Sequence, residues 1–423
     1  MSSAATMPPS TTTTRSDGTT STVAPLKPVR ERLISLDVFR GITIAAMLLV
    51  NDPGSWGAIF PPLEHAEWNG WTPTDLIFPF FLFIVGITTH LSLSARRARG
   101  DDDSAILRQV LHRGAIIYLL GFLMALFPFY QWGTIDGISD PSVLDRIVVR
   151  LQHVRILGVL PRIAIAYVCG ALLTSHTTLK QQVAIIATLL FGYWFAMTLI
   201  PVPGEGGTIG ALLLDDKSRN LAAYLDRAIL GTNHTWDGSV TFDPEGPMST
   251  IPAIGTVMLG VIAGRWVAMR ERSLIERMAG LFAAGSIAMM IGMMWNWVFP
   301  INKSLWTSSY VMFTAGMACI GIALVMWVVE HYNVRWWTRP FVIYGVNPIF
   351  AFVGSGVMAR LIYTLWHVNY DGRSQAIQSV IYQSVFLPWL PPRVASLGFA
   401  ICFVLLWLGI LTVMYRRNII LKV

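Results

Sequence analysis

The sequence predicts an all-α fold, a polytopic transmembrane helical bundle of about ten helices. Hydrophobic residues make up 54% of the 423 residues and charged residues only 13%, the profile of a chain solvated by lipid. Apolar runs of roughly 17–25 residues, enough for one helix to cross the hydrocarbon core, alternate with short polar links. Both observations exclude a soluble globular protein, and Pro or Gly within a run is compatible with a spanning helix.

The elements follow in order along the chain. Residues 1–30 are rich in Ser, Thr and Pro and lack an apolar run, which predicts a disordered cytoplasmic tail rather than a cleavable signal peptide. Residues 31–423 are predicted to form one transmembrane domain. Its expected spans are 33–51, 73–94, 109–130, 156–174, 182–201, 249–269, 278–299, 305–329, 341–365 and 395–415.

The charges predict an orientation for these spans. The net charge is +7, but Lys and Arg cluster in the even-numbered links, as in Arg96, Arg97 and Arg99, which is typical of cytoplasmic loops and not of nucleic-acid binding. The first link, 52–72, has no Lys or Arg, and the link 202–248 is rich in carboxylates. We therefore expect both termini to be cytoplasmic and these two links to lie outside. The link that holds Arg146, Arg150 and Arg155 fits this rule less well.

The three cysteines, Cys169, Cys319 and Cys402, lie inside apolar runs and show no metal-ligand spacing. They are interpreted as small core residues, and no metal is predicted. The sequence leaves the oligomeric state open, with a homodimer as one alternative.

The first outside link contains the richest group of polar residues. His65 is flanked by carboxylates, and imidazole is able to act as a general base near neutral pH or as an acyl-accepting nucleophile. Glu64, Glu67 or Asp75 could orient the ring, and Asn51 could donate to an oxyanion. The alternative is that His65 is a satisfied interfacial polar group.

Two arginines in RILGVLPRIAIAY, Arg155 and Arg162, lie about two helical turns apart and could present guanidinium groups to phosphates. For Arg155 alone, snorkelling to lipid headgroups is the favoured interpretation. Asp243 and Glu245 precede a helix that Ser249 could cap, which would account for both carboxylates.

Three other positions are weaker candidates. Asn302 and Lys303 lie at an outside boundary, and Asn347 precedes Pro348 inside an apolar run. Nearer the start of the chain, Asp37 and Arg40 are three residues apart, which favours a structural ion pair.

Taken in order, the strings LISLDVFRGITIAAMLLVN, EHAEWNGWTPTDLIFPFFLFIVG, RILGVLPRIAIAY, FDPEGPMSTIPAIGTVMLGVIAG, PINKSLWTSSY and YGVNPIF resemble the heparan-α-glucosaminide N-acetyltransferase family. The resemblance runs from residue 33 to the end of the chain. It implies acetyl transfer from acetyl-CoA to the amine of a glucosamine, with His65 as the active-site histidine and Asn51 as the family's asparagine. The sequence departs from that of the lysosomal enzyme in two places. It has three more residues between Asn51 and His65, and it has LPR where LQR is common. The compact links are similar to bacterial inner-membrane relatives.

Two functions remain in competition at this point. The first is an integral membrane acyltransferase that uses acetyl-CoA as co-substrate and an amino sugar or envelope glycan as acceptor. Its catalytic residues would be His65, Asn51 and Asp75. The second is a transporter for N-acetylglucosamine or a related sugar, which should show inverted repeats, and none is detected. In the acyltransferase, the predicted contacts to CoA are Arg162, Arg155, Lys303, Asn302 and Asn347.

Overall fold

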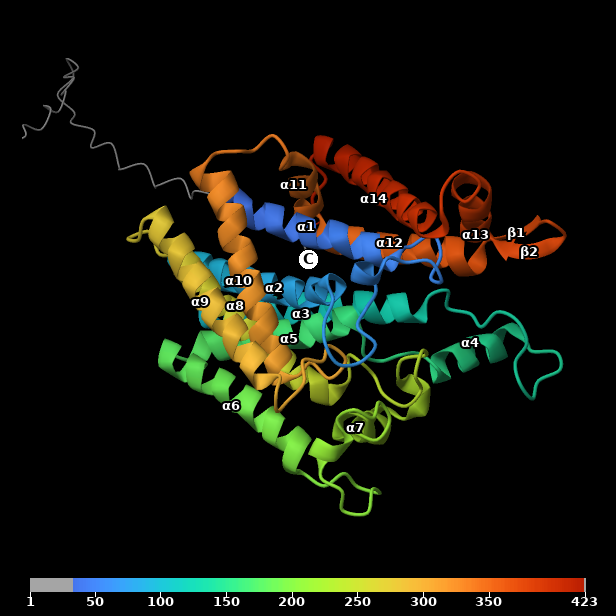
Figure 1. Cartoon of the computed structure of the whole chain (residues 1–423), viewed down its shortest axis with the longest axis horizontal. Helices are drawn as coiled ribbons and strands as arrows, with labels where there is room; N and C mark the ends of the chain where they lie inside the picture. The colour runs from blue at the N-terminus through green and yellow to red at the C-terminus, as the bar shows by residue number, and fades with distance from the viewer. Residues whose placement is uncertain (1–32, 422–423) are drawn as a thin grey trace, which may run out of the picture. The chain divides into compact units, whose positions relative to one another are not determined.

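The computed structural model describes residues 33–421, and its helices confirm the predicted all-α membrane bundle (Figure 1). Within these residues, ten helical segments are long and apolar enough to cross a membrane. The predicted tail, 1–30, lies outside the described residues. The helices that form the spans are α1 (Ile34–Asn51), α2 (Ile77–Arg99), α3 (Asp103–Leu126), α5 (Val159–His176), α6 (Leu179–Leu199), α8 (Pro247–Val267), α9 (Leu274–Trp295), α10 (Ser308–Met326), α12 (Pro348–Arg360) and α14 (Pro392–Arg416).

Shorter elements occupy the links between the spans. The longest of these helices are amphipathic, α4 (Val143–Gln152) and α7 (Leu221–Leu230). A two-stranded antiparallel hairpin, β1 (His367–Tyr370) and β2 (Arg373–Ala376), projects beside α13 (Ile377–Ile381). A short helix, α11 (Arg339–Val346), precedes α12.

The helix starts follow local capping rules. Capping boxes open α6 and α9, where Thr178 pairs with Gln181 and Ser273 with Glu276. Asp102 caps α3 by accepting from the Ala105 N–H at 3.2 Å. Each of these short polar signals satisfies N–H groups that have no partner inside the helix.

Two predicted spans differ from the structure because of proline. The span 341–365 is divided into α11 and α12 at Asn347, because Pro348 disfavours helical backbone at the residue before it. The span 109–130 ends earlier, as α3, since helical backbone is disfavoured at Phe127, the residue before Pro128; its earlier start follows from the Asp102 cap. Neither change alters the number of crossings.

Glycines allow several helices to approach closely. A Cβ on Gly86 of α2 would lie 2.0 Å from the Val257 carbonyl oxygen of α8, and one on Gly260 would lie 2.1 Å from that of Phe83. Gly41 of α1 similarly faces the Phe341 carbonyl of α11. Small residues at such crossings are the usual means of packing helices in lipid, where apolar side chains gain little from leaving the bilayer.

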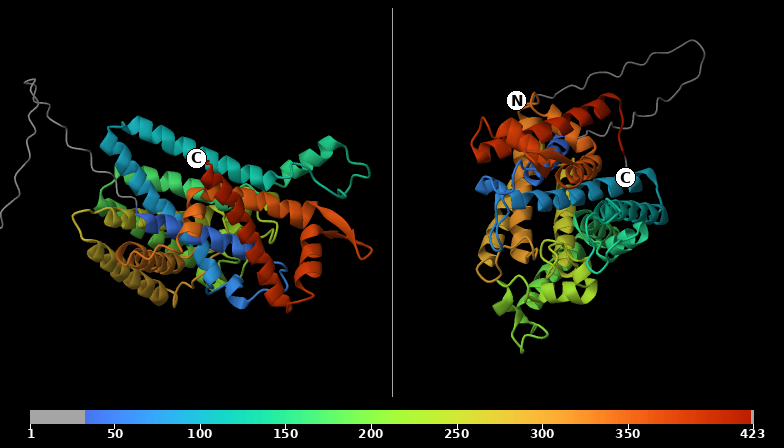
Figure 2. Two further views of the ribbon diagram at one scale, coloured as in Figure 1. Left: turned by 90° about the horizontal axis from the view of Figure 1, so that it is seen from above. Right: turned by 90° about the vertical axis from the view of Figure 1, so that its right-hand side faces the viewer.

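The links gather in two groups, as alternating crossings require. The odd-numbered links bind one another: Asn69 Nδ2 donates to Asp215 Oδ1 at 2.5 Å, and Asn302 Nδ2 donates to Asn69 Oδ1 at 3.1 Å. At the opposite end, Arg97 Nη2 donates to the Ser175 carbonyl at 2.8 Å. Figure 1 shows α4 and the hairpin at the right and the α8–α9 link at the left, and Figure 2 gives two further views.

The arginines that fitted the orientation rule poorly are occupied by the protein itself. Arg146 Nη1 donates to the Gln131 carbonyl at 2.9 Å, and Arg150 donates to three carbonyls at the end of α3. Arg360 of α12 adds a bond to the neighbouring Met124 carbonyl. Arg150 and Arg360 thus complete the C-terminus of α3, whose last carbonyls lack helical partners, and Arg146 binds the link that follows it.

Candidate active site

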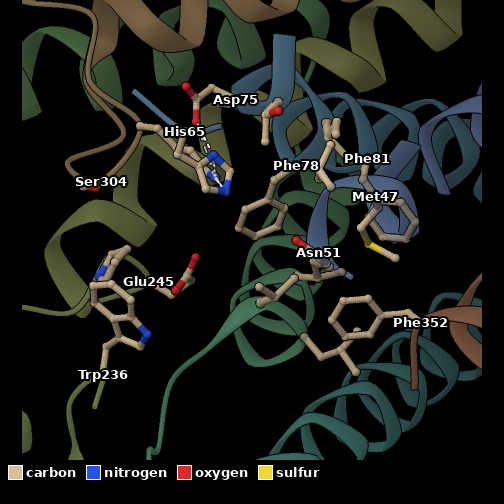
Figure 3. Close-up of a pocket in the computed structure, with 18 of the residues that line it drawn as sticks. Met47, Asn51, His65, Asp75, Phe78, Phe81, Trp236, Glu245, Ser304 and Phe352 are labelled. Carbon is tan, nitrogen blue, oxygen red and sulfur yellow. Dashed lines mark hydrogen bonds and ion pairs between the residues drawn. The ribbon is translucent and has the colours of Figure 1, made fainter. Parts of the chain in front are cut away.

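A cavity of about 420 Å³ opens among α1, α2, α5, α12 and the odd-numbered links (Figure 3). Its wall is largely apolar, with Met47, Phe78, Phe81 and Phe352 among the lining residues. Polar groups lie at one end, which is the composition typical of a ligand site. On α1 the lining extends from Asn51 to Thr43, a depth of about 12 Å at the rise of an α-helix.

His65 and Asp75 form the central polar pair of this cavity. The Nδ1 atom of His65 lies 2.7 Å from Asp75 Oδ1, and the histidine side chain is half exposed while that of Asp75 is buried. When Nδ1 carries the proton and donates it to Asp75, Nε2 keeps its lone pair and is available as a base. Of the three carboxylates predicted as partners, Asp75 is the one that binds the ring. Glu67 lines the cavity, whereas Glu64 is not part of its lining.

Lys303 lies against the same imidazole. Its Nζ is 3.1 Å from Nδ1 and 3.2 Å from Nε2 of His65, so it faces the ring rather than a single lone pair, and it is 3.6 Å from Asp75 Oδ1. Burial lowers the pKa of Lys303, and the neighbouring carboxylates Asp75 and Glu245 offset this only in part. Its ammonium therefore loses a proton more readily than that of a lysine in water.

The local fold fixes Asp75 firmly. This residue lies in a single 3-10 turn, Pro73–Leu76, and its Oδ2 accepts the N–H groups of Ala66 and Thr72, each at 3.0 Å. Tyr310 Oη of α10 donates to the Asp75 carbonyl at 2.5 Å. One oxygen is thus committed to the loop that carries His65, and the other is free to hold the ring.

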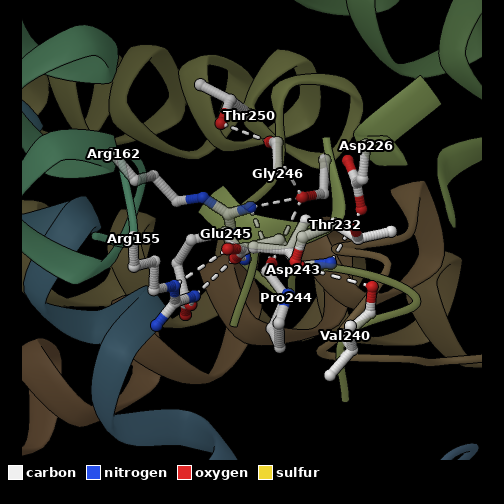
Figure 4. A network of polar contacts seen from close by, with 12 residues as sticks. Arg155, Arg162, Asp226, Thr232, Val240, Asp243, Pro244, Glu245, Gly246 and Thr250 are labelled. Carbon is white, nitrogen blue, oxygen red and sulfur yellow. Dashed lines mark hydrogen bonds and ion pairs between the residues drawn. The ribbon is translucent and has the colours of Figure 1, made fainter. Parts of the chain in front are cut away.

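A second polar group, Arg155 with Asp243 and Glu245, forms part of the cavity wall (Figure 4). Arg155 binds both carboxylates, with Nε 2.8 Å from Asp243 Oδ2 and Nη2 in contact with both residues. Burial acts to lower the pKa of Arg155, but the two carboxylates outweigh it and raise that pKa. The expectation that Arg155 snorkels to lipid headgroups is wrong, because the guanidinium has internal partners.

The capping explanation for these carboxylates is also wrong. Helix α8 begins at Pro247 with Gly246 as its N-cap and no side-chain cap. Ser249 instead accepts a bond from Arg162 and donates to the Pro244 carbonyl at 3.2 Å. Although burial acts to raise it, the pKa of Glu245 is lowered by Arg155 and Arg162, which keep the carboxylate ionised.

Three residues predicted to contact CoA lie outside the cavity lining. Arg162 is fully buried, with its guanidinium carbon 5.0 Å from the centre of the Trp306 ring. Asn302 Oδ1 accepts the Leu305 N–H at 2.9 Å, and Asn347 binds the main chain at Ile419 and Leu421. Each has a structural bonding role here, and its contact with CoA stays a prediction.

The remaining predicted residues are brought together. Asn51, His65, Asp75, Arg155 and Lys303 all line the one cavity. Asp37 and Arg40 form the expected ion pair at 2.8 Å.

The cavity also contains residues that sequence reasoning did not assign to the site. They come from the long link 202–248 and from α12, namely Lys217, Trp236, Phe242, Glu245 and Phe352. A Glu and a Trp on an acid-rich link give a weak signal by themselves, because exposed links contain both without function. Their place in the cavity depends on contacts between residues far apart in sequence.

Comparison with known proteins identifies the family. A model of the family "Heparan-alpha-glucosaminide N-acetyltransferase, catalytic" matches residues 32–295. The human protein named heparan-alpha-glucosaminide N-acetyltransferase is 28% identical over 93% of this chain and 60% of its own length. Its mouse counterpart is 28% identical over 84% of the chain and 58% of its own length, so the chain spans about three fifths of these relatives. Because the family match covers more than half of the sequence, the chain belongs to the heparan-alpha-glucosaminide N-acetyltransferase catalytic family.

Proposed function

We propose that this protein is an integral membrane acetyltransferase that transfers the acetyl group of acetyl-CoA to the amine of an amino sugar. Family membership and the names of the human and mouse relatives support the transferase class and the glucosaminide acceptor. The observation that carries the proposal is the His65–Asp75 pair at 2.7 Å inside a mainly apolar cavity. Such a pair supplies the base that amide formation from a thioester requires.

The proposed chemistry begins with removal of a proton from the acceptor ammonium by His65 Nε2, which leaves a neutral amine. The amine nitrogen attacks the acetyl carbonyl, so that a C–N bond forms and a tetrahedral oxyanion appears. Collapse of this intermediate breaks the C–S bond, and the CoA thiolate takes the proton from the imidazolium. The remaining proton on nitrogen passes to water, leaving the acetylated amine and free CoA.

The oxyanion needs donors beside the carbonyl, and two cavity residues are candidates. Asn51 is exposed to the cavity at the end of α1, and Lys303 lies against the His65 ring. A positioned donor of this kind typically contributes a few kcal/mol to the transition state. The position of Lys303 supports a role at the reacting carbonyl better than the predicted contact with a phosphate.

A covalent route is compatible with the same residues. His65 would attack the acetyl carbon itself, releasing CoA and forming an acetyl-imidazole that the amine then resolves. Asp75 would stabilise the positive charge on the ring during the first step. Recovery of radiolabelled acetyl on the protein in the absence of acceptor would favour this route.

The test is replacement of His65 by Ala in the full-length protein. We expect acetyl transfer to glucosamine to fall by several orders of magnitude, while CoA still raises the thermal midpoint, as a ligand of the native state does. His367→Ala, on the exposed hairpin, is the matched control. Near-normal transfer by folded His65→Ala protein would contradict the proposal, and uptake of labelled N-acetylglucosamine into proteoliposomes would then test the transporter alternative.

A further inference from the structure

One wall of the cavity combines a fixed carboxylate with an indole ring, and the proposed transfer chemistry uses neither. Glu245 projects into the cavity between Trp236 and His65 (Figure 3). Arg155 binds its Oε2 atom and so fixes the position of the carboxylate. Because the pKa of Glu245 is lowered, it presents a negative charge at neutral pH.

Trp236 is supported from behind. Its ring lies 6.2 Å from the Phe242 ring in an edge-on arrangement, and a Cβ on Gly238 would approach the indole to 2.5 Å. Gly238 and Phe242 cover only part of Trp236, which lines the cavity and remains 40% exposed. A supported indole offers an open aromatic face, which attracts cations and the polarised C–H groups of a sugar ring.

The second indole on this wall, that of Trp68, is already occupied. Lys217 Nζ lies 5.8 Å from the centre of the Trp68 ring, and Trp68 Nε1 donates to the Leu214 carbonyl at 2.9 Å. The Trp68 ring also packs against the Phe242 ring, with the ring centres 5.5 Å apart, and so helps to hold the link in place. Trp236 is the indole on this wall that is open to a ligand.

We infer that Glu245 and Trp236 form the subsite for the acceptor, with the carboxylate binding the ammonium of the amino sugar and the indole stacking on its ring. The inference rests on the proposed function, since it assigns a place to the acceptor within the same cavity. The arrangement supports an amino sugar over a neutral sugar, because an ammonium can form an ion pair with the ionised carboxylate of Glu245 and a neutral hydroxyl cannot. It also places the amine on the same side of the cavity as His65, which must receive its proton.

The positive charges nearby do not oppose this assignment. Lys303 is paired with Asp75 at 3.6 Å, although its charge also acts on Glu245, and Arg155 shares its charge between Asp243 and Glu245. Lys217 faces the Trp68 ring. A ligand cation would thus meet a carboxylate that Arg155 holds in a fixed position.

The first experiment measures binding without chemistry, so that its failure is distinguishable from failure of the proposed function. Full-length His65→Ala protein in nanodiscs is titrated with D-glucosamine and with D-glucose. We expect glucosamine to bind at least tenfold more tightly than glucose, and adding Glu245→Gln to remove that preference. Equal affinity for the two sugars in the His65→Ala protein, or an unchanged preference after Glu245→Gln, would overturn the inference.

The second experiment uses the active protein. Glu245→Gln and Trp236→Ala should each raise the KM for glucosamine about tenfold, and leave the thermal shift produced by CoA unchanged. Glu64→Gln and Trp56→Ala are matched controls from the first link, since neither residue lines the cavity. Unchanged KM in both test variants overturns the subsite. If Glu245→Gln removes the preference for glucosamine but the wild-type protein shows no transfer activity, the subsite stands and the proposed function is contradicted instead.

Discussion

At the scale of single residues, the most direct prediction concerns Asp75. Replacing it with Asn removes the charge that fixes the His65 tautomer, and we expect transfer to fall by two to four orders of magnitude. Affinity for CoA should be unchanged. Asp215→Asn, on the same end of the molecule, is the control because it binds Asn69 rather than His65.

A double replacement distinguishes catalysis from folding in this case. If Asp75 acts through His65, the variant lacking both side chains should be no slower than His65→Ala alone. Additive losses would mean that Asp75 contributes mainly by holding Ala66 and Thr72 in place.

Because Asp226 of α7 is buried, we predict that the stability of the folded protein depends on pH. Its Oδ2 accepts the Asp243 N–H at 2.9 Å, and burial raises its pKa to about 7. The neutral acid is therefore favoured in the folded state. The protonated side chain contributes its full stability below pH 3.8, the ordinary pKa of an aspartate. This contribution is lost progressively as the pH rises to about 7 and above, and the total loss in the free energy of unfolding is at most about 4 kcal/mol.

Asp226→Asn should consequently raise the thermal midpoint at pH 8 and change it little at pH 4. Thermal unfolding in detergent across this range, with exposed Asp140→Asn as control, measures the effect. A variant whose midpoint follows the wild-type pH profile would show that Asp226 is ionised in the folded protein.

The residues of the cavity differ in how far the sequence could predict them. His65 was predicted because imidazole beside carboxylates is chemically informative, and the structure places it with Asp75 and Asn51 in one cavity. Glu245 was not assigned to the site because its partner, Arg155, is 90 positions away. Short-range patterns suggested a helix cap, and only the fold supplies the ion pair.

At the scale of elements, the crossing of α2 and α8 predicts which glycines tolerate a methyl group. Gly86→Ala should destabilise the protein by several kcal/mol, because the new Cβ would meet the Val257 carbonyl, a backbone atom that cannot move aside alone. Gly192→Ala in α6 should be neutral or slightly stabilising, since nothing lies within 4 Å of its Cβ position. Thermal midpoints of the two variants in detergent provide the comparison, and equal midpoints would argue against the close crossing.

The spans themselves were largely predictable because membrane thickness sets their length. Hydropathy does not report where a helix breaks inside an apolar run. Pro348 was visible in the sequence and accounts for the division into α11 and α12, but the bonds that hold Asn347 to Ile419 and Leu421 were not visible there. Local pattern thus predicts that a crossing exists, and tertiary contacts decide its shape.

At the scale of the whole molecule, we predict that the odd-numbered links face outside and both termini face the cytoplasm. The two groups of links lie at opposite ends of the bundle, so one labelled position on each group determines the orientation. Single cysteines near Gly206 and Arg272, in a background without Cys169, Cys319 and Cys402, should react with an impermeant reagent from opposite sides. Reaction near Gly206 only from the cytoplasmic side would reverse the assignment.

Residues that interact at the site lie far apart along the chain, so the site is completed late during synthesis. Lys303 reaches His65 across 238 positions, and Arg360 reaches the end of α3 across 236. When the ribosome has completed the region matched by the family model, which ends at residue 295, neither contact can yet exist. The wall supplied by Phe352 is also still missing. The histidine emerges early, but its surroundings are completed only when Lys303 and Phe352 have been made, so a nascent chain that ends before residue 352 has no finished site.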